Sequence, residues 1–505
     1  MLQTTKPPLY REIATLFTRQ VSSGALRPGD RVPSLRRLSR DHRVSMSTVQ
    51  QAYLWLESRG YLEARPQSGF YVRTPASRMI PEPQFELRPT RAAESVSDAI
   101  LSDILAAAED PANIPFGAGV ASPELFPNRR LGLILRRLIR RQPLHSSCYT
   151  FPPGAQLLRR QIARRAAQVG CSLSPEEIII TCGALEAINL ALRSVARPGT
   201  AIAVESPTYF GILGTAASLG MKVIEVPTHP QQGMDLAELD RAVRRHNVQV
   251  CVTQTNCQNP LGYVVADDQK KSLIALADKH KLVVIEDEVY RDLTFEGPQP
   301  RSLKSFDRQG RVLLCSSVSK TLSPGLRIGW VAAGKYRSQV ERLKLLTTVA
   351  TAGLPQTVVA EFLASGGYDR HLRHLRGMLA AQMEAVRQAI AKYFPPGTRI
   401  SRPLGGYMLW VQLPHGVEAL ELYRDALAEH ISILPGMIFS ASGRFKEFIR
   451  INCGHVWSET HDRALLRLGR LCEKHLDQAA AASRERSKIF GRRSGAVSAV
   501  VQSNH

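Results

Sequence analysis

The chain has 505 residues, which is too long for one simple core and predicts two or more domains. Its hydrophobic fraction of 44% and charged fraction of 22% are those of an ordinary globular protein. The formal net charge of +22 is unusual and favours an anionic partner, with nucleic acid first and a membrane surface second. An arginine-rich composition without any such partner is the alternative.

Cysteine spacing and hydropathy exclude several further classes of protein. The 8 cysteines are scattered without a CxxC pair, so neither a zinc site nor a disulfide framework is expected. The N-terminus lacks the apolar stretch of a signal peptide, and no run approaches the length of a transmembrane helix. We therefore expect a cytoplasmic protein with no metal and no membrane partner.

Residues 1–75 show three short helical patterns followed by two short strands. Ser34 and Ser45 stand where the second and third helices need an N-terminal cap. The segment holds 12 Lys and Arg against 5 Asp and Glu, a charge of +7. A polar start to the third helix beside a basic hairpin suits reading of the DNA major groove, and a protein-interaction module is the alternative.

Three stretches of this segment carry a family resemblance: 8–13, 24–38 (GALRPGDRVPSLRRL) and 44–49 (VSMSTV). They resemble the winged helix-turn-helix of GntR regulators, although Met46 stands where the family often has arginine. The resemblance implies double-stranded DNA, a promoter or operator, as a partner. The DNA-binding residues that it implies are Arg36, Ser45, Ser47, Thr48, Gln50 and, in the wing, Ser68 and Gly69.

Residues 76–95 combine prolines with little periodicity, which predicts a partly extended linker. From 96 to 475, helical patterns alternate with short apolar strands. Strands buried on both faces predict a mainly parallel sheet covered by helices, with ligands outside the carboxyl ends of the strands. The predicted strands are 178–181, 201–204, 248–252, 282–285 and 312–314.

Polar residues follow several of these strands. Gly183 opens a helix whose free N–H groups suit a phosphate, although a glycine in such a turn is common for steric reasons. Tyr209 could stack on a flat ring, and Asn259 could donate to a phenolic oxygen. Asp287, with Tyr290 after it, could keep a pyridine nitrogen protonated. A metal site or a solvated acidic cluster is the alternative for this acidic stretch.

The stretch from Ser316 to Trp330 places one lysine among small hydroxyl residues. The Lys320 amine can form a Schiff base with an aldehyde, while Ser317, Ser319 and Arg327 can donate to phosphate oxygens. Pyridoxal 5'-phosphate is the candidate cofactor. A solvated loop lysine is the alternative for this stretch taken alone.

Residues 115–470 resemble the fold type I pyridoxal-phosphate enzymes of the class I aminotransferase family. The resemblance implies an α/β fold with a mainly parallel sheet and a smaller C-terminal α+β subdomain. It implies Lys320 as the aldimine lysine, Arg450 as the partner of a substrate carboxylate, and Tyr149 as a residue that reaches the phosphate from the neighbouring subunit. The cofactor-binding residues that it implies are Tyr149, Gly183, Ala184, Tyr209, Asn259, Asp287, Tyr290, Ser317, Ser319, Lys320 and Arg327.

The two halves together resemble the MocR family of bacterial regulators, which implies a head-to-tail homodimer. The hypothesis is a regulator in which an amino acid or amine, or pyridoxal phosphate itself, acts at Lys320 and changes promoter binding. A working aminotransferase with a DNA-tethering module and a pure cofactor sensor are the alternatives. Residues 476–505 lack a core pattern and are expected to form a basic, disordered tail.

Overall fold

The computed structural model describes residues 9–22, 26, 29–58, 61–65, 68–72, 80–84, 98–141 and 147–501. The chain forms two compact units, one of residues 1–80 with 383–393 and the other of residues 81–382 with 394–505. Within the described ranges, no helix combines the length and apolar character needed to cross a membrane.

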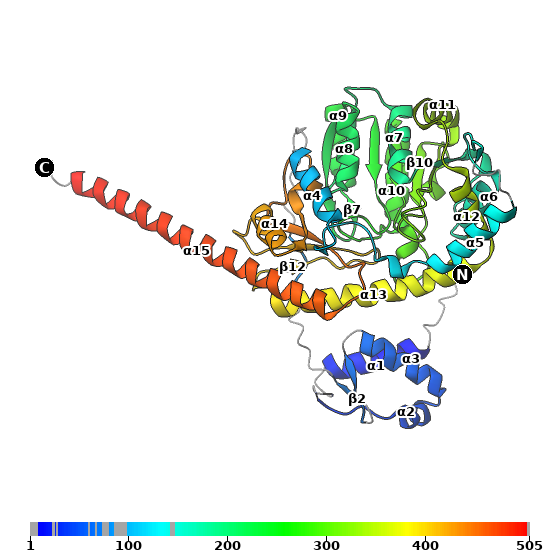
Figure 1. The fold of residues 1–505 in the computed structure, drawn as a ribbon. Coiled ribbons are helices and arrows are strands. Elements are labelled where there is room, and N and C mark those ends of the chain that lie inside the picture. The colour runs from blue at the N-terminus through cyan, green and yellow to red at the C-terminus, as the bar shows by residue number, and fades with distance from the viewer. Residues whose placement is uncertain are drawn as a thin grey trace. The chain divides into compact units, whose positions relative to one another are not determined.

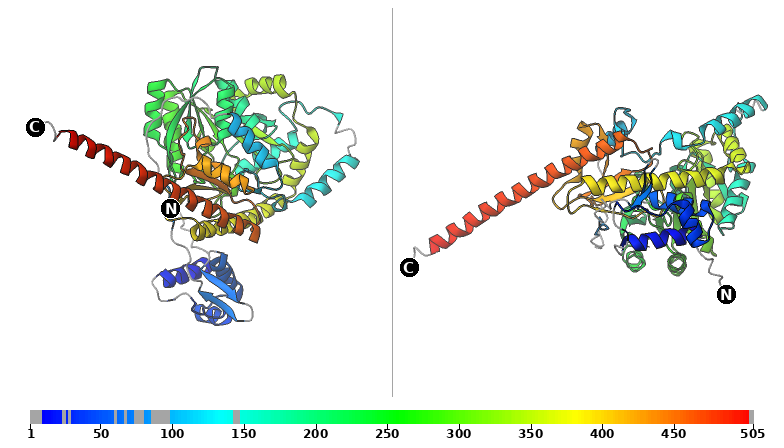
Figure 2. Two further views of the ribbon diagram at one scale, coloured as in Figure 1. Left: turned by 60° about the vertical axis from the view of Figure 1, so that its left-hand side comes forward. Right: turned by 90° about the horizontal axis from the view of Figure 1, so that it is seen from below.

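The described part of residues 9–72, which lie in the small unit, forms three helices and a two-stranded hairpin. This segment is drawn in blue in the left-hand view of Figure 2. Its elements are α1 (Leu9–Ser22), α2 (Leu35–His42), α3 (Met46–Ser58), β1 (Leu62–Arg65) and β2 (Gly69–Val72). Both predicted caps are present: the Ser34 hydroxyl accepts from the Arg37 N–H at 3.3 Å, and the Ser45 hydroxyl accepts from the Thr48 N–H at 3.1 Å. The expected winged helix-turn-helix is therefore confirmed as a fold.

The core of this unit forms around one face of α3. Val49, Ala52, Tyr53 and Leu56 are fully buried, as the sequence pattern predicts. The Tyr53 ring meets Phe17 of α1 edge-on at 5.5 Å, and burial of these side chains favours the packing of α1 on α3. The buried face of α1 is narrower than the sequence pattern predicts, because the Leu9 and Leu16 side chains are exposed.

The large unit is built on an eight-stranded sheet with the strand order β4-β11-β10-β9-β8-β5-β6-β7 (Figure 1). The pairs from β6 through β5, β8 and β9 to β10 are parallel, whereas β11 and β7 pair antiparallel with their neighbours. All five predicted strands are present, and β6, β7 and β11 were not among them. The bounds are β4 (Ile178–Thr181), β5 (Ala201–Ser206), β6 (Lys222–His229), β7 (Gly233–Met234), β8 (Val250–Thr253), β9 (Val283–Asp287), β10 (Val312–Ser317) and β11 (Gly329–Ala332).

Helices cover both faces of this sheet because its strands are apolar at successive positions. In β4, Ile179 packs toward one helical layer, whereas Ile178 and Ile180 pack toward the other. The first layer consists of α7 (Ala184–Val195), α8 (Phe210–Ser218) and α11 (Arg337–Thr348). The second consists of α5 (Asn128–Arg141), α6 (Gln156–Gln168), α9 (Leu236–His246), α10 (Asp267–His280) and α12 (Gly353–Ala364).

A smaller subdomain of the large unit contains a four-stranded sheet with the order β12-β13-β16-β15. This is the α+β subdomain that the resemblance implies. Its strands are β12 (Arg399–Ile400), β13 (Met408–Gln412), β15 (Leu434–Pro435) and β16 (Phe448–Asn452), and β3 (Ile114–Pro115) pairs with β14 (Ile431–Ser432). The remaining helices are α4 (Asp98–Glu109), α13 (Gly367–Tyr393), α14 (Ala419–Ala428) and α15 (Glu459–Val501).

Two segments differ from the expectation at the ends of the large domain. Residues 81–84 of the predicted linker belong to the large unit: the Ile400 N–H donates to the Pro81 carbonyl at 3.1 Å, and the Gln84 N–H donates to Gln412 Oε1 at 2.9 Å. Residues 76–79 and 85–95 of the predicted linker lie outside the described residues. The backbone is helical up to Val501, where a disordered tail was expected, because alanine, arginine and glutamate all favour helix.

Candidate cofactor and ligand site

The residues that follow the central strands meet at the carboxyl edge of the large sheet. Asp287 ends β9, Ser317 ends the adjacent parallel strand β10, and Lys320 follows three residues later. Lys320 Nζ lies 5.9 Å from the centre of the Tyr290 ring. The structure thus brings together residues that are far apart in the sequence, as the parallel-sheet prediction requires.

Asp287 is buried, with 3% of its surface exposed, and two neighbours fix its carboxylate. The Gln254 side-chain amide donates to Oδ2 at 2.6 Å, and the Val289 N–H donates to Oδ1 at 3.1 Å. Burial raises the pKa of Asp287 to about 6, and the bond from Gln254 is the largest opposing influence. The carboxylate is therefore ionised near neutral pH and can pair with a protonated ring nitrogen.

The Lys320 amine has the properties of a nucleophile rather than of a solvated cation. Burial, assisted by the Arg450 guanidinium, lowers the pKa of Lys320 to about 8. Its Nζ donates to the Gly119 carbonyl at 2.5 Å. A substantial neutral fraction at physiological pH is what attack on an aldehyde requires.

A close-packed turn forms the predicted phosphate end of the site. Gly183 has a φ of 87° and precedes the first turn of α7, which begins at Ala184. A Cβ at Gly183 would lie 2.6 Å from Arg327 Nη2, and a Cβ at Gly329 would lie 2.4 Å from the Gly183 backbone. Because neither glycine has a side chain, the Arg327 guanidinium can lie close to the N-terminus of α7. Free N–H groups and positive charge at this point favour an anion.

The hydroxyl residues and the arginine of this turn are locally ordered. The Ser317 hydroxyl accepts from the Ser319 N–H at 3.3 Å, and Arg327 Nη2 donates to the Cys182 carbonyl at 3.0 Å. Ser317 and Ser319 are both buried. Ser317 ends β10, and Ser319 lies in the turn that follows it and leads to Lys320, so these two serines and the predicted lysine belong to one short segment.

Arg450 of β16 lies deep in the site, with only 1% of its surface exposed. Its Nη2 donates to the Gly117 carbonyl at 2.6 Å, and its Nη1 donates to Asn259 Oδ1 at 3.3 Å. Burial lowers the pKa of Arg450, and none of the ion pairs among the described residues involves it. A buried guanidinium that meets only neutral acceptors is well suited to bind a carboxylate.

Two of the predicted residues contact the site less directly. Tyr149 is 73% exposed, and its ring stacks on Phe151 at 5.4 Å. Tyr209 precedes α8, and its partly buried ring lies 4.7 Å from the Phe210 ring. Burial raises the pKa of Tyr209, and the charges of Arg450 and Asp287 act on it in opposite directions, Arg450 lowering it and Asp287 raising it.

Sequence reasoning missed three residues that complete the site: Gln254, Tyr407 and Asn452. Gln254 follows β8 directly. Polar residues at this position, just after a strand, are the ones that the sequence indicated for other strands of the sheet. Asn452 lies two residues after Arg450 on β16, a spacing that puts both side chains on one face of the strand. Its amide donates to the carbonyls of Ala118 at 2.5 Å and Val120 at 2.8 Å. No sequence signal identified Tyr407.

The site's residues fit pyridoxal 5'-phosphate. Arg450 Nε and the Thr208 hydroxyl are buried without a hydrogen-bond partner in the described structure, so polar capacity remains for a ligand. Lys320 would hold the aldehyde carbon, Asp287 the ring nitrogen, and Gly183, Ala184, Ser317, Ser319 and Arg327 the phosphate. When bound, the cofactor supplies an electron sink. Among the described residues, no group of three or more His, Cys, Asp or Glu side chains is placed to hold a metal ion.

The predicted DNA-reading residues lie on the surface of the small unit. Arg36, Ser45, Ser47 and Gln50 are exposed, and Thr48 is partly buried. The Ser45 hydroxyl lies 2.8 Å from the Ser47 hydroxyl, so two hydroxyl groups lie close together at the N-terminus of α3. In the wing, the Ser68 hydroxyl lies 2.6 Å from that of Tyr71, and Gly69 is exposed. These features suit phosphate and base contacts, whose assignment to single residues stays a prediction.

Comparison with known proteins gives the same two-part organisation. The family model for bacterial regulatory proteins of the gntR family matches residues 9–72, and that for aminotransferase class I and II matches residues 143–468. The HTH-type transcriptional regulator YdcR of Escherichia coli (strain K12) is 40% identical over 92% of this chain and 99% of that protein. The chain belongs to the MocR family. A second E. coli relative in this family, the HTH-type regulator YjiR, is 36% identical over 91% of this chain and 98% of its own length.

Solved structures support the assignment of the MocR large domain. The α-aminoadipate aminotransferase LysN of Thermus thermophilus, complexed with N-(5'-phosphopyridoxyl)-L-leucine, superimposes with a TM-score of 0.70. It is 27% identical and covers 75% of this chain and 95% of that chain. The large domain is therefore a fold type I domain whose cofactor is pyridoxal 5'-phosphate, joined to a GntR-type DNA-binding domain.

Proposed function

We propose that this protein is a cytoplasmic transcriptional regulator whose promoter binding responds to an amino acid or amine at the Lys320 site. The exposed Tyr149 supports a head-to-tail homodimer, because a residue that completes a neighbour's phosphate site must face away from its own domain. Two DNA readers in such a dimer would recognise two half-sites. The relatives' names as HTH-type transcriptional regulators support regulation as the main role.

The observation that carries the proposal is the set of hydrogen bonds from Arg450, Lys320 and Asn452 to the backbone of residues 117–120. Arg450 donates to the Gly117 carbonyl, Lys320 to the Gly119 carbonyl, and Asn452 to the carbonyls on either side of Gly119. A ligand carboxylate would compete with a neutral carbonyl for Arg450, and a charged acceptor is the stronger one. Ligand binding would therefore release this loop and create a second state of the subdomain.

The chain leading to the DNA reader is attached to the same subdomain. Glu82 pairs with Arg402 at 3.3 Å, accepts from the Gln231 amide at 2.8 Å, and its carbonyl accepts from Arg399 at 3.4 Å. Arg399 begins β12, which is joined through β13 to the strand that carries Arg450. A movement of this sheet would therefore pull on the chain that leads to the reader. We call residues 81–84 the linker clamp.

The test measures binding of fluorescent DNA from the protein's own upstream region while amino acids and amines are added to the holo protein. For the effective ligand, Arg450→Lys should weaken the response about tenfold or more in ligand concentration, because lysine keeps the charge but loses the two-pronged donor. Arg463→Lys, an exposed exchange on α15, is the matched control and should leave the response unchanged. Lys320→Ala should abolish it. A full response in Lys320→Ala would refute the proposal.

The complete set of Lys320, Asp287 and Arg450 favours a second candidate, an aminotransferase whose N-terminal domain tethers it to DNA. Steady formation of a keto acid from an amino acid and 2-oxoglutarate, with promoter binding insensitive to both, would support this candidate instead. Promoter binding that responds to pyridoxal phosphate but to no amine would identify a cofactor sensor.

A further inference from the structure

An arginine-lined pocket lies on the large unit between α6, the segment after β9 and the start of α13. Its volume is about 430 Å³, within the range of small-molecule sites. None of its lining residues belongs to the cofactor site described above. Its charged lining residues are Arg165, Arg291, Arg373, Arg376, Asp292 and Asp369.

The two aspartates of this pocket are already paired with two of its arginines. Arg165 binds Asp369 at 2.8 Å and Asp292 at 3.4 Å, and Arg291 binds Asp292 at 2.9 Å. Burial tends to raise the pKa of Asp292, but these two arginines outweigh it and hold that pKa below its ordinary value. Asp292 is therefore an anion held by two arginines, and it also favours the charged form of nearby Arg376. Arg291 has a further carboxylate, that of Glu288, at 3.4 Å.

The other two arginines have no carboxylate partner among the residues that the structure describes. Arg376 Nε donates to the Asp292 backbone carbonyl at 2.6 Å, a neutral acceptor, and Arg373 is exposed without an ion pair. Burial lowers the pKa of Arg376 by more than the nearby Asp292 raises it. Four arginines and two aspartates line the pocket, an excess of two positive charges, and Arg373 and Arg376 lie one helical turn apart on α13.

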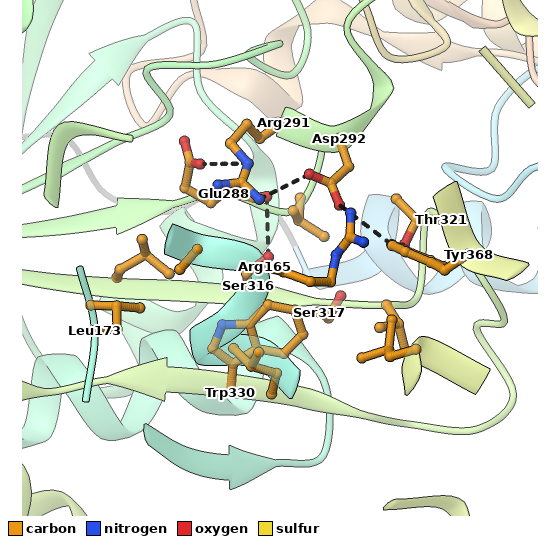
Figure 3. Close-up of a pocket in the computed structure, with 16 residues that line it drawn as sticks. Arg165, Leu173, Glu288, Arg291, Asp292, Ser316, Ser317, Thr321, Trp330 and Tyr368 are labelled. Atoms are coloured by element: carbon orange, nitrogen blue, oxygen red, sulfur yellow. Dashed lines mark hydrogen bonds and ion pairs between the residues drawn. The ribbon is translucent and has the colours of Figure 1, made fainter. Parts of the chain in front are cut away.

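A chain of contacts connects the pocket to the lysine segment, as Figure 3 shows for Arg165, Asp292, Tyr368 and Thr321. The Arg165 guanidinium lies 4.2 Å from the centre of the Tyr368 ring. The Tyr368 hydroxyl lies 3.4 Å from Asp292 Oδ2 and donates to the Thr321 hydroxyl at 2.7 Å. Thr321 follows Lys320 directly, so a shift of the ion pairs would reach the cofactor lysine through one tyrosine.

We propose that this pocket is a second ligand site for a small molecule that carries a dianionic phosphate group, and that its occupation alters the surroundings of Lys320. A phosphate dianion matches the excess of two positive charges among the lining residues, whereas one carboxylate would match only one of them. The pocket is larger than inorganic phosphate alone requires, which leaves room for an organic part. This site is separate from the amino-acid site at Arg450 and goes beyond the proposed function.

Titration calorimetry of the holo protein with inorganic phosphate tests the site, because the cofactor then occupies its own phosphate turn. One saturable event per chain is expected, and Arg373→Ala and Arg376→Ala should each weaken it at least tenfold. Arg370→Ala, on an exposed residue of α13 that does not line the pocket, is the matched control. Absence of saturable binding, or equal affinity in all variants, would overturn the site. Equally tight binding of succinate would overturn its assignment to phosphate.

The coupling to Lys320 has its own readout. Phosphate should shift the absorbance of the bound cofactor, and Tyr368→Phe should remove that shift while calorimetry still shows phosphate binding. A shift that persists in Tyr368→Phe would refute the route through Thr321. None of these measurements uses an amino acid or DNA, so their failure is distinguishable from failure of the proposed function.

Discussion

Replacement of Gln254 by leucine should reveal how strongly one buried amide controls the cofactor site. Gln254 donates to Asp287 Oδ2 at 2.6 Å and accepts from the Asn259 N–H at 2.9 Å. A hydrogen bond to a charged group contributes about 1.5–3 kcal/mol, and 1.36 kcal/mol corresponds to about one pH unit. Its loss should therefore raise the pKa of Asp287 further, by about 1–2 pH units above the present value of about 6.

The consequence is a carboxyl that is largely protonated at neutral pH and cannot pair with a protonated pyridine nitrogen. Cofactor affinity of Gln254→Leu, measured by titrating the apo protein with pyridoxal phosphate, should fall about twofold to tenfold at pH 7, because the ionised fraction of Asp287 falls by that factor. The loss should diminish as the pH rises, because Asp287 then ionises again. Gln249→Leu, on an exposed residue just before β8, is the control. A uniform loss at all pH values would indicate misfolding of the site and refute this reasoning.

Three further outcomes are expected. The rate of cofactor uptake by the apo protein should rise with pH and level off above about pH 8, the pKa of Lys320. With an unperturbed lysine, the rate would keep rising to about pH 10.5. A continued rise past pH 9 would contradict the burial argument. Gly183→Ala should weaken cofactor binding at least tenfold without unfolding the domain, because its Cβ would displace the Arg327 guanidinium; an unchanged dissociation constant would show that this contact is dispensable. Glu82→Ala should change the free energy of unfolding by less than about 1 kcal/mol yet reduce the effect of the amino acid on DNA binding; an intact response would exclude the linker clamp as the route.

The sequence predicted most of the site because its signals are local. Gly183, Asp287 and Lys320 each follow a continuously apolar strand, and parallel strands end at one edge of the sheet. Strand β11 was missed because its short apolar run, GWVA, directly follows the polar turn that contains Lys320 and was interpreted as the end of that segment. Gln254 and Tyr407 were missed because their roles depend on which side chains face them across the fold, and spacing alone does not encode that.

The ends of the large domain were also mispredicted for physical reasons. Prolines in residues 81–84 indicated an unattached segment, but an extended backbone can still accept from the N–H of a neighbouring strand, as Pro81 does from Ile400. That hydrogen bond uses only the proline carbonyl, so the N–H group that proline lacks is not needed. At the C-terminal end, the absence of an apolar pattern indicates only that residues 476–501 do not pack into a core. The intrinsic preference of these residues for helix then determines their backbone conformation.

The linker clamp also determines at which residue a fragment of the large domain can begin without losing contacts. A fragment that begins at residue 81 keeps the Pro81 carbonyl on the edge of β12 and the Gln84 N–H on Gln412. A fragment that begins at residue 96, the boundary expected from the sequence, leaves the Ile400 N–H and the Arg402 guanidinium without these acceptors. The shorter fragment exposes a short strand edge, which is a site for pairing with other chains. Stable isolation of the large domain therefore requires residues that composition alone assigns to the connection.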